Sequence, residues 1–252
     1  MIRELHVWML PSMIPPAALR DGAAVIIDLL RASTTIVRAL AAGAERIIPS
    51  LEPDLAMLQR DAMIAQGLSR DSIMLGGERA GLRIAGFDLA NTPAEYTPTR
   101  VSGRTIIFTT TNGTRALYAA REAEASPIIM GCFNNLVAVN SALLAQPTIH
   151  LVCAGTQGQV SIEDVICAGA MVASITASAP HTRLDDQARI ALAAWEAAAR
   201  TGLESALRAS RGGQNLIDIG LDHDITDCAG IDTHPVVPRL MNDGSLQVRE
   251  QT

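Results

Sequence analysis

The chain has 252 residues, of which 48% are hydrophobic and 18% charged, and its formal net charge is −6 at pH 7. This composition is typical of a globular protein with a large core and excludes a disordered or fibrous chain. The acidic balance argues against a general nucleic-acid-binding protein, and the sequence has no basic patch with interleaved aromatic residues.

The residue types that the chain lacks exclude several kinds of chemistry. All 20 basic residues are arginine, so neither a lysine Schiff base nor a P-loop lysine is available. The four cysteines show no CxxC spacing, which argues against a zinc site and for reduced thiols. Arg3, Glu4 and His6 interrupt the apolar stretch of a signal peptide, and no run approaches the roughly 18–20 apolar residues of a membrane span. We therefore expect a cytoplasmic protein with no membrane or nucleic-acid partner.

Strands and helices alternate over most of the chain. Short β-branched runs predict strands over 5–10, 25–28, 44–48, 72–75, 104–109, 127–131 and 148–153. Helical periodicity predicts helices over 33–42, 53–66, 114–124 and 134–145. Further helices are expected over 163–178, 185–200, 202–210 and 222–230. This order predicts an α/β fold with three α/β/α layers, a largely parallel sheet and a helical C-terminal part.

The chain shows no internal repeat and no obvious linker. We therefore expect one α/β domain over residues 1–240, followed by a loose polar tail over 241–252. One connection, over 79–103, is too long for a simple turn, and loops of that length are usually functional.

Five of the predicted strands end in clusters of polar and glycine residues. The clusters begin at Asp28, Gly76, Thr109, Gly131 and Ala154, and most precede a helix. Ligands of open α/β sheets bind in the crevice outside the carboxyl ends of the strands, where helix N-termini also point. The five ends therefore predict one shared site that favours an anion.

The first cluster combines a carboxylate, an arginine and hydroxyls. Asp28 ends a buried strand, and Ser33 and Thr34 stand in the first turn of the next helix. The carboxylate can hold a divalent cation or act as a nucleophile, and the helix N-terminus can hold a phosphate. Arg31 supplies paired donors for an oxyanion. The alternative is that Asp28 or Ser33 caps the helix and has no chemical role.

The third cluster favours a nest of backbone N–H groups. Thr111, Asn112, Gly113 and Thr114 stand between a strand and a helix, and the Asn-Gly pair permits positive φ. An ordinary strand-to-helix turn would have the same spacing, so both interpretations stay open.

Carboxylates near these strand ends indicate a magnesium site. Glu78 follows two glycines, Asp88 lies in the long connection, and Glu163 and Asp164 follow the fifth cluster. Mg²⁺ prefers hard oxygen ligands and needs only one or two carboxylates beside water and a substrate phosphate. For Glu163 and Asp164 the alternative is a favourable interaction with the dipole of the helix that they begin.

Six segments in this order resemble the 2-phosphosulfolactate phosphatase family. They are Asp28-Leu-Leu-Arg-Ala-Ser-Thr-Thr-Ile36, Gly77-Glu-Arg79, Gly86-Phe-Asp-Leu-Ala-Asn-Thr-Pro93, Thr110-Thr-Asn-Gly-Thr114, Cys153-Ala-Gly155 with Glu163-Asp164, and Val236-Val-Pro238. The resemblance covers residues 25–240. It implies Mg²⁺-dependent hydrolysis of 2-phospho-3-sulfolactate to 3-sulfolactate and phosphate, a step of coenzyme M synthesis. Ala90 stands where the family commonly has glycine in its Gly-Asn-Ser-Pro segment.

The motifs and the resemblance together predict the site residues and the partner. Catalytic roles are expected for Asp28, Arg31, Asn112 and Thr114. Substrate binding is expected for Ser33, Thr34, Arg79, Asn91, Thr111, Gly113, Asn134 and Gly155. The expected Mg²⁺ ligands are Asp28, Glu78, Asp88, Glu163 and Asp164. The partner is a small polyanionic phosphate ester, and a homo-oligomer is a possible state.

Two other functions remain open at this point. The phosphatase could act on another small phosphorylated hydroxy acid, or the chain could bind an anionic metabolite without catalysis. The carboxylates speak against the second function, because a pure anion binder gains nothing from them. Direct attack by water is favoured over a phosphoenzyme formed on Asp28.

Overall fold

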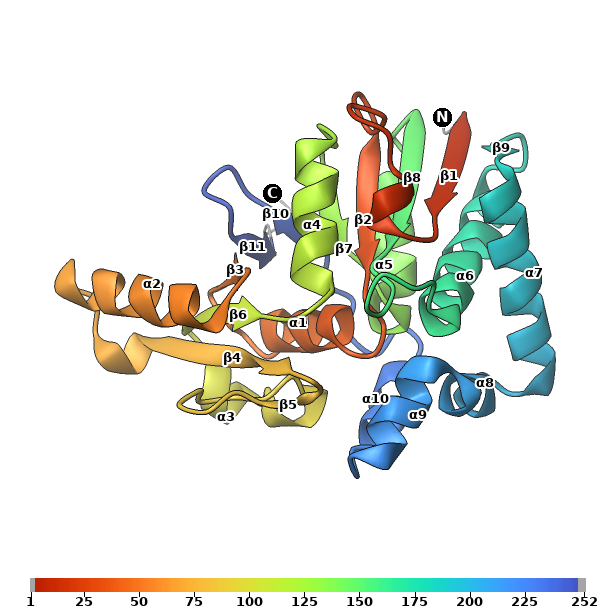
Figure 1. The fold of residues 1–252 in the computed structure, drawn as a ribbon. Helices are drawn as coiled ribbons and strands as arrows, with labels where there is room; N and C mark the ends of the chain where they lie inside the picture. Colours follow the sequence, from red (N-terminus) through yellow and green to blue (C-terminus); the bar gives the residue numbers. More distant parts are fainter. Residues whose placement is uncertain (1–2, 249–252) are drawn as a thin grey trace.

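Eleven strands form one sheet in the computed structural model, which describes residues 3–248 (Figure 1). The strands are β1 (Glu4–Trp8), β2 (Ala23–Ile27), β3 (Arg46–Ser50), β4 (Ile73–Arg79), β5 (Leu82–Arg83), β6 (Thr105–Thr109), β7 (Ile128–Met130), β8 (Thr148–Cys153), β9 (Arg183–Leu184), β10 (Pro238–Leu240) and β11 (Leu246–Val248). Their order across the sheet is β5-β4-β6-β3-β11-β10-β7-β2-β8-β1-β9.

Ten α-helices and four 3₁₀ turns connect the strands within the described residues. The helices are α1 (Ala32–Ala41), α2 (Pro53–Ala65), α3 (Pro98–Val101), α4 (Gly113–Glu122), α5 (Leu136–Leu143), α6 (Ile162–Ser178), α7 (Asp186–Thr201), α8 (Leu203–Ala209), α9 (Arg211–Asp218) and α10 (His223–Ala229). The 3₁₀ turns are η1 (Pro11–Met13), η2 (Arg70–Ser72), η3 (Pro93–Glu95) and η4 (Phe133–Asn135).

The sheet consists of two parallel groups joined by an antiparallel hairpin. Strands β4, β6 and β3 are mutually parallel, and so are β7, β2, β8, β1 and β9. The hairpin of β10 and β11 lies between them and pairs antiparallel with β7 and with β3. The short strand β5 adds an antiparallel edge to β4. Figure 1 shows the two groups running in different directions, with the carboxyl ends of β2, β4 and β6 turned toward the same region.

The hairpin corrects the prediction of a loose tail from residue 241. Leu246 is fully buried and pairs with Ile47, so this end of the chain is part of the sheet. Strands of three residues are too short to show an alternating pattern, which is why the periodicity missed them. The Asn242-Asp243-Gly244 turn between them is a hairpin signal in its own right. Residues 249–252 of the predicted tail lie outside the described residues.

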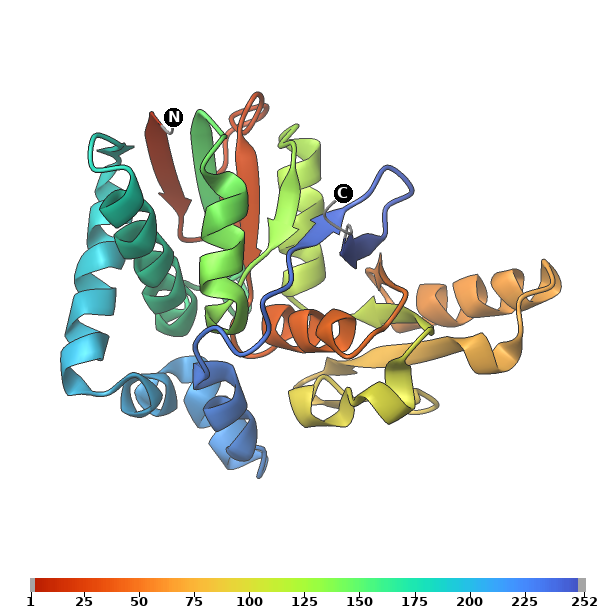
Figure 2. The ribbon, with the colours of Figure 1, turned by 180° about the vertical axis from the view of Figure 1, so that it is seen from behind.

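Helices cover both faces of the sheet, as predicted for three layers (Figure 2). Along β2, Val25 and Ile27 pack into one core with α5, α6 and α7, whereas Ala24 and Ile26 pack into a second core with α1 and α4. A strand that is buried on both faces consists of an unbroken run of apolar residues. All residues of β2 are apolar and buried. A third, smaller core lies between α2 and strands β4 and β6.

The expected helices of the C-terminal part are present, and the long connection has its own structure. Residues 79–103 contain β5, η3 and α3. Helices α8, α9 and α10 follow α7 and pack against one another. Among residues 3–248, none of the helices has both the length and the apolarity needed to cross a bilayer.

An aromatic cluster joins β1 to β8 away from the strand ends described above. His150 stacks on His6 with ring centroids 5.2 Å apart, and its Nδ1 accepts the Nε1–H of Trp8 at 3.3 Å. Burial, with a smaller effect of His6, lowers the pKa of His150 from 6.5 to about 4. The carboxylates of Glu4 and Asp185 contact His6, on the other side of the stack. A protonated His150 could no longer accept the Trp8 N–H.

The free energy of unfolding should therefore fall as the pH is lowered. Between pH 6.5 and about 4 the unfolded chain binds a proton at His150 that the folded chain does not, so acid favours unfolding. The slope from this group is at most about 1.4 kcal/mol per pH unit, the value for one proton. Urea unfolding at a series of pH values should show a smaller slope for His150→Gln. His181→Gln, at an exposed histidine, controls for the loss of an imidazole, and an equal slope in both variants would contradict the assignment.

Candidate active site

A cavity of about 600 Å³ lies where the strand ends of the two groups meet. Seven of the predicted site residues line it: Asp28, Arg31, Glu78, Arg79, Asn91, Thr111 and Asn112. The ends of β2, β4, β6 and β8 all contribute to its wall, so four of the five polar strand ends share one site, as predicted.

Asp28 lies between the first turns of two helices. Its Oδ1 accepts the backbone N–H of Ala32, in α1, at 3.3 Å. The backbone N–H of Gly113, at the start of α4, also faces the carboxylate. A Cβ atom on Gly113 would lie 2.8 Å from Asp28 Oδ2, so the close approach of α4 requires glycine. Burial raises the pKa of Asp28 to about 7, and the charges of Glu78 and Glu163 add to this rise.

Glu78 fixes the end of β4 against the start of α4. Its Oε1 accepts the backbone N–H of Thr111 at 2.9 Å and the Thr111 hydroxyl at 3.0 Å. Its Oε2 accepts the backbone N–H of Gly81 at 2.8 Å. The residue is 8% exposed, so these bonds orient its carboxylate at the cavity wall.

Asp164 joins the ends of two strands of the other group. Its Oδ1 accepts the N–H of Leu29, after β2, at 2.8 Å, and its Oδ2 accepts the N–H of Gly155, after β8, at 3.0 Å. Burial raises the pKa of Asp164, and the charges of Glu163 and Asp28 raise it further. Neither Asp164 nor Gly155 is part of the cavity lining. Their role is to hold the ends of β2 and β8 together behind the residues that line the cavity.

Glu163 is buried beside the cavity with one oxygen unused. The carboxylate lies against Gly212 of α9, and its Oε2 forms no hydrogen bond with the described residues. Burial raises its pKa, an effect that the hydroxyls of Ser210 and Ser161 partly offset. A buried carboxylate oxygen without a donor is costly unless a cation or a ligand satisfies it.

The structure does not bring all five predicted magnesium ligands together. Asp88 lies apart from the cavity, where its Oδ2 accepts the N–H of Leu75 at 2.8 Å and its Oδ1 faces Arg70 at 3.5 Å. After β5 the chain returns alongside β4, where Leu89 forms a β-bridge with Gly76. Asp88 therefore lies beside Leu75 and not at the end of the strand. Among residues 3–248, no three His, Cys, Asp or Glu side chains form a group that could hold a metal ion by themselves.

A magnesium ion needs only one or two protein carboxylates beside water and a phosphate, and Asp28 and Glu163 are the two candidates for such ligands. Asp28 opens into the cavity, and Glu163 offers its unused oxygen close enough for the two charges to interact. Their mutual repulsion, together with Glu78 and Asp164, leaves a strongly negative spot that a hard cation would neutralise.

Arg31 lies in the cavity wall, and three of its five N–H donors bind other groups of the protein. Its Nη1 donates to Asp224 Oδ2 in α10 at 2.5 Å and to Thr92 Oγ1 at 3.1 Å. Its Nη2 donates to the carbonyl oxygen of Gly81 at 2.6 Å. Its Nε–H and the second N–H of Nη2 form no hydrogen bond with the described residues, so the expected contact of Arg31 with a substrate oxyanion stays a prediction. The buried ion pair with Asp224 makes Arg31 a residue that positions the wall.

The hydroxyl groups of Ser33 and Thr34, in α1, form hydrogen bonds with the backbone and do not line the cavity. Ser33 Oγ donates to the carbonyl oxygen of Asp28 at 2.8 Å and accepts the Asp28 N–H at 3.2 Å. Thr34 Oγ1 donates to the carbonyl oxygen of Leu29 at 3.0 Å. Both residues are fully buried outside the cavity lining, so the expected substrate contacts of Ser33 and Thr34 are not found.

The predicted nest at the start of α4 lies partly at the surface of the cavity. Thr111 and Asn112 line the cavity, whereas Thr114 lies behind them with its hydroxyl 3.4 Å from that of Thr110. Gly113 contacts the cavity indirectly, through Asp28. Thr114 therefore stabilises the turn. It does not line the cavity, so no contact in the structure supports its predicted catalytic role.

Asn134 lies outside the site, which corrects its prediction as a substrate-binding residue. Its Nδ2 donates to the carbonyl oxygens of Asp227 at 3.1 Å and Gly230 at 2.6 Å. These bonds tie the end of α10 to η4, directly after β7. The β7 end is the one polar strand end of the five that does not reach the cavity lining.

One wall of the cavity comes from α9 and the residue after it, and it was not predicted. Its lining residues are Gly212, Asn215, Leu216, Asp218 and Ile219. The signal in the sequence was the pair Gly212-Gly213 just after Ser210, which caps α9 by accepting the Gly213 N–H. Adjacent glycines near a helix start disfavour the helix and indicate a close approach to something else.

Asn91 supplies a polar atom that the described residues leave unused. The residue is 4% exposed and lines the cavity, and its Oδ1 has no hydrogen-bond partner among residues 3–248. Together with Glu163, it makes two buried side-chain oxygens beside one cavity that lack a donor. A polar ligand or a cation in the cavity would provide the missing partner for such oxygen atoms.

Comparison with known proteins gives one consistent result. The model of the family described as 2-phosphosulpholactate phosphatase matches residues 8–243. A protein of Symbiobacterium thermophilum named probable 2-phosphosulfolactate phosphatase is 38% identical over 241 residues, 94% of this chain and 99% of its own length. Proteins of the same name from Parasynechococcus marenigrum and Pseudothermotoga lettingae are 38% and 35% identical, over 97% and 91% of this chain and 99% and 94% of their own lengths.

Proposed function

Because the chain belongs to the 2-phosphosulpholactate phosphatase family, we propose that it hydrolyses 2-phospho-3-sulfolactate to 3-sulfolactate and phosphate in a Mg²⁺-dependent reaction. The observation that carries the proposal is the position of Asp28. This buried carboxylate opens into a cavity of about 600 Å³ between the N-termini of α1 and α4. Helix N-termini favour phosphate groups, and the carboxylate favours the cation that accompanies them.

Asp28 and Glu163 are the residues that would hold Mg²⁺, for the reasons of geometry and charge given above. The bound ion would neutralise negative charge on the phosphate ester and lower the pKa of water. Glu78 has a structural role and is not one of these ligands, because its two oxygens already accept hydrogen bonds from the β4–β5 turn and from the residues before α4.

The remaining groups act on the phosphate and on the proton. The backbone around Thr111 and Asn112 faces the cavity at the positive end of α4. Arg79 stands in the same wall, where its guanidinium donates to the carbonyl oxygens of Glu78 and Leu51 and adds positive charge. In the proposed step a water oxygen forms a bond to phosphorus while the bond from phosphorus to the ester oxygen breaks. Asp28 accepts the proton of the water, and the sulfolactate oxygen takes up a proton from solvent water as it leaves.

Phosphate release from three substrates, with Mg²⁺ and with EDTA, tests the proposal. We expect release from 2-phosphosulfolactate with Mg²⁺, little release in EDTA, and slower release from phospholactate and phosphoglycolate, which lack the sulfonate. Equal turnover in metal-free enzyme would overturn the metal assignment. Faster release from phospholactate would assign another phosphorylated hydroxy acid as substrate, and binding without release under any metal would leave a metabolite-binding protein.

Two adjacent glycines of α9 provide a test of the position of Glu163. A Cβ atom on Gly212 would overlap Glu163 Oε1, the end of a side chain that can turn away. A Cβ atom on Gly213 would overlap the carbonyl oxygen of Leu207, which can move only with the backbone of α8. We expect Gly213→Ala to lower the free energy of unfolding by about 1–3 kcal/mol, as overpacking does. Gly212→Ala should keep the fold and lower kcat.

Urea unfolding and phosphate release separate the two effects. If Gly212→Ala kept the wild-type kcat, the orientation of Glu163 would not matter for turnover. If instead it unfolded as readily as Gly213→Ala, the glycine would serve packing alone.

A further inference from the structure

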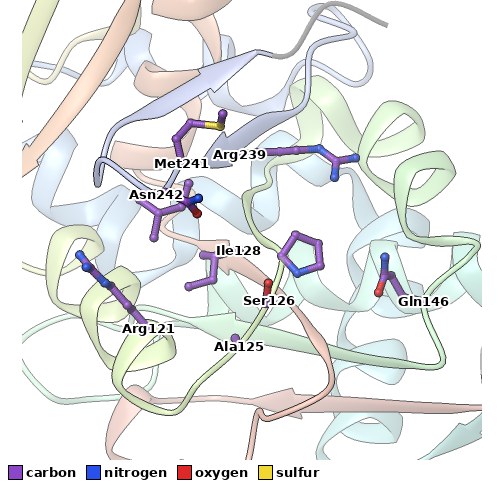
Figure 3. A pocket seen from close by; sticks show the side chains of 10 residues that line it. Arg121, Ala125, Ser126, Ile128, Gln146, Arg239, Met241 and Asn242 are labelled. Atoms are coloured by element: carbon purple, nitrogen blue, oxygen red, sulfur yellow. The ribbon is translucent and has the colours of Figure 1, made fainter. Parts of the chain in front are cut away.

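A second cavity, of about 630 Å³, lies at the opposite end of α4 from the candidate active site (Figure 3). Its walls come from the last turn of α4, the start of β7, the loop after α5, and the β10–β11 hairpin. The lining residues are Arg121, Ala125, Ser126, Pro127, Ile128, Gln146, Arg239, Leu240, Met241 and Asn242. None of these residues has a role in the proposed phosphatase reaction.

The polar side chains of this cavity have no partners in the described part of the chain. Arg121 and Arg239 form neither a hydrogen bond nor an ion pair through their side chains with residues 3–248. The same holds for the side chains of Ser126, Gln146 and Asn242. No aspartate or glutamate of this part of the chain lines the cavity. In a chain of net charge −6, two arginines without carboxylates around one cavity form a local positive site.

The two arginines lie on different sides of the cavity. Figure 3 shows Arg121 coming from α4 on one side and Arg239 coming from β10 on the other, with Asn242 and Ile128 between them. A single small anion would meet only one guanidinium in this arrangement. A longer molecule with an acidic group at each end could meet both, and arginine binds carboxylates and phosphates through paired donors.

We propose that this cavity is a binding site for a small elongated dianion, with one carboxylate or phosphate held by Arg121 and the other by Arg239. The amides of Gln146 and Asn242 and the hydroxyl of Ser126 supply further hydrogen bonds along the ligand. The apolar floor, formed by Ile128 and Leu240, suits a short hydrocarbon linker between the acidic groups. The site is independent of the phosphatase reaction, since it shares no lining residue with the other cavity.

Binding of two homologous series of probes tests the proposal. The probes are unbranched α,ω-dicarboxylates and α,ω-bisphosphonates with two to six methylenes, and the controls are the matching monoacids. Titrations followed by NMR of the full chain should give a lower Kd for at least one diacid than for its monoacid, with shifts at the amides of Ile128 and Met241. Arg121→Gln and Arg239→Gln should each raise the Kd of that diacid to the level of the monoacid, a change of about tenfold or more, as for the loss of one charged hydrogen bond.

Arg200→Gln, at an exposed arginine of α7 away from both cavities, is the matched control and should leave the Kd unchanged. Phosphate release should also be unchanged in all three variants when no probe is present. The proposal is overturned if neither series binds, if diacids bind no better than monoacids, or if the Arg121 and Arg239 variants bind as the wild type does. Loss of binding in Arg200→Gln as well would reduce the effect to overall charge and would equally overturn it.

Discussion

Replacement of Asp28 by asparagine is expected to lower kcat by about 10²–10³-fold, the range found when one key electrostatic group of an active site is removed. The asparagine side chain has nearly the same shape, and its oxygen can still accept the N–H of Ala32. It carries no charge for a cation, and it cannot take the proton of an attacking water. Phosphate release at saturating Mg²⁺ and substrate measures the loss.

The same substitution should not weaken the fold. Asp28 is buried together with the charges of Glu78 and Glu163, which repel it and raise its pKa. Removal of its charge relieves this repulsion, so the free energy of unfolding of Asp28→Asn should equal or exceed that of the wild type. Asp218→Asn, at an exposed carboxylate in the same cavity wall, makes the same chemical change without touching Asp28, and its kcat should stay near the wild-type value. A normal kcat in Asp28→Asn would reduce Asp28 to a helix cap.

Asp224→Asn is expected to lower the free energy of unfolding by about 3–5 kcal/mol, the cost of breaking a buried ion pair from one side. The side chains of Arg31 and Asp224 are 2% and 0% exposed, and their closest atoms lie 2.5 Å apart. The substitution leaves a buried guanidinium without its counter-charge. It should also lower kcat/KM, because Arg31 holds Gly81 and Thr92 at the site while Asp224 is not part of the cavity lining.

A double-mutant cycle distinguishes the ion pair from general packing. Arg31→Met with Asp224→Leu should lose less stability than the sum of the two single changes, because neither charge is then left alone. Arg31→Lys keeps a charge but cannot reach Asp224, Thr92 and Gly81 from one ammonium group, so it should resemble Asp224→Asn. Glu124→Gln breaks the exposed pair with Arg20 and should change stability little. Equal effects of Glu124→Gln and Asp224→Asn would show that burial of the pair is unimportant.

The parts of the site that could be predicted from the sequence depend on local geometry. Asp28, Glu78, Thr111 and Asn112 each stand at or just after the end of a strand, and their direction follows from the strand itself. The α/β alternation likewise follows from apolar runs that are long enough to show a period. These features required no knowledge of how distant segments meet.

The parts that could not be predicted depend on contacts between distant segments. Asp88 stands in a loop, and only the pairing of Leu89 with Gly76 shows that this loop runs back along β4. Asn134 stands at a strand end, but α10 lies there instead of the cavity. Helix α9 lies far beyond β4 and β6 in the sequence, and no local pattern connects it with them. Its place in the cavity wall arises only through tertiary packing.

The hairpin in the middle of the sheet has a consequence for how the protein is made. Leu246 pairs with Ile47, and Arg239 pairs with Ile129, so the two groups of strands are joined by residues that the ribosome adds after it has made both groups. Contacts between residues this far apart in sequence form slowly, and domains fold as units. The sheet is therefore completed only when this segment pairs with both groups, although it does not line the cavity and α1 and α4 already connect the two halves of the candidate active site.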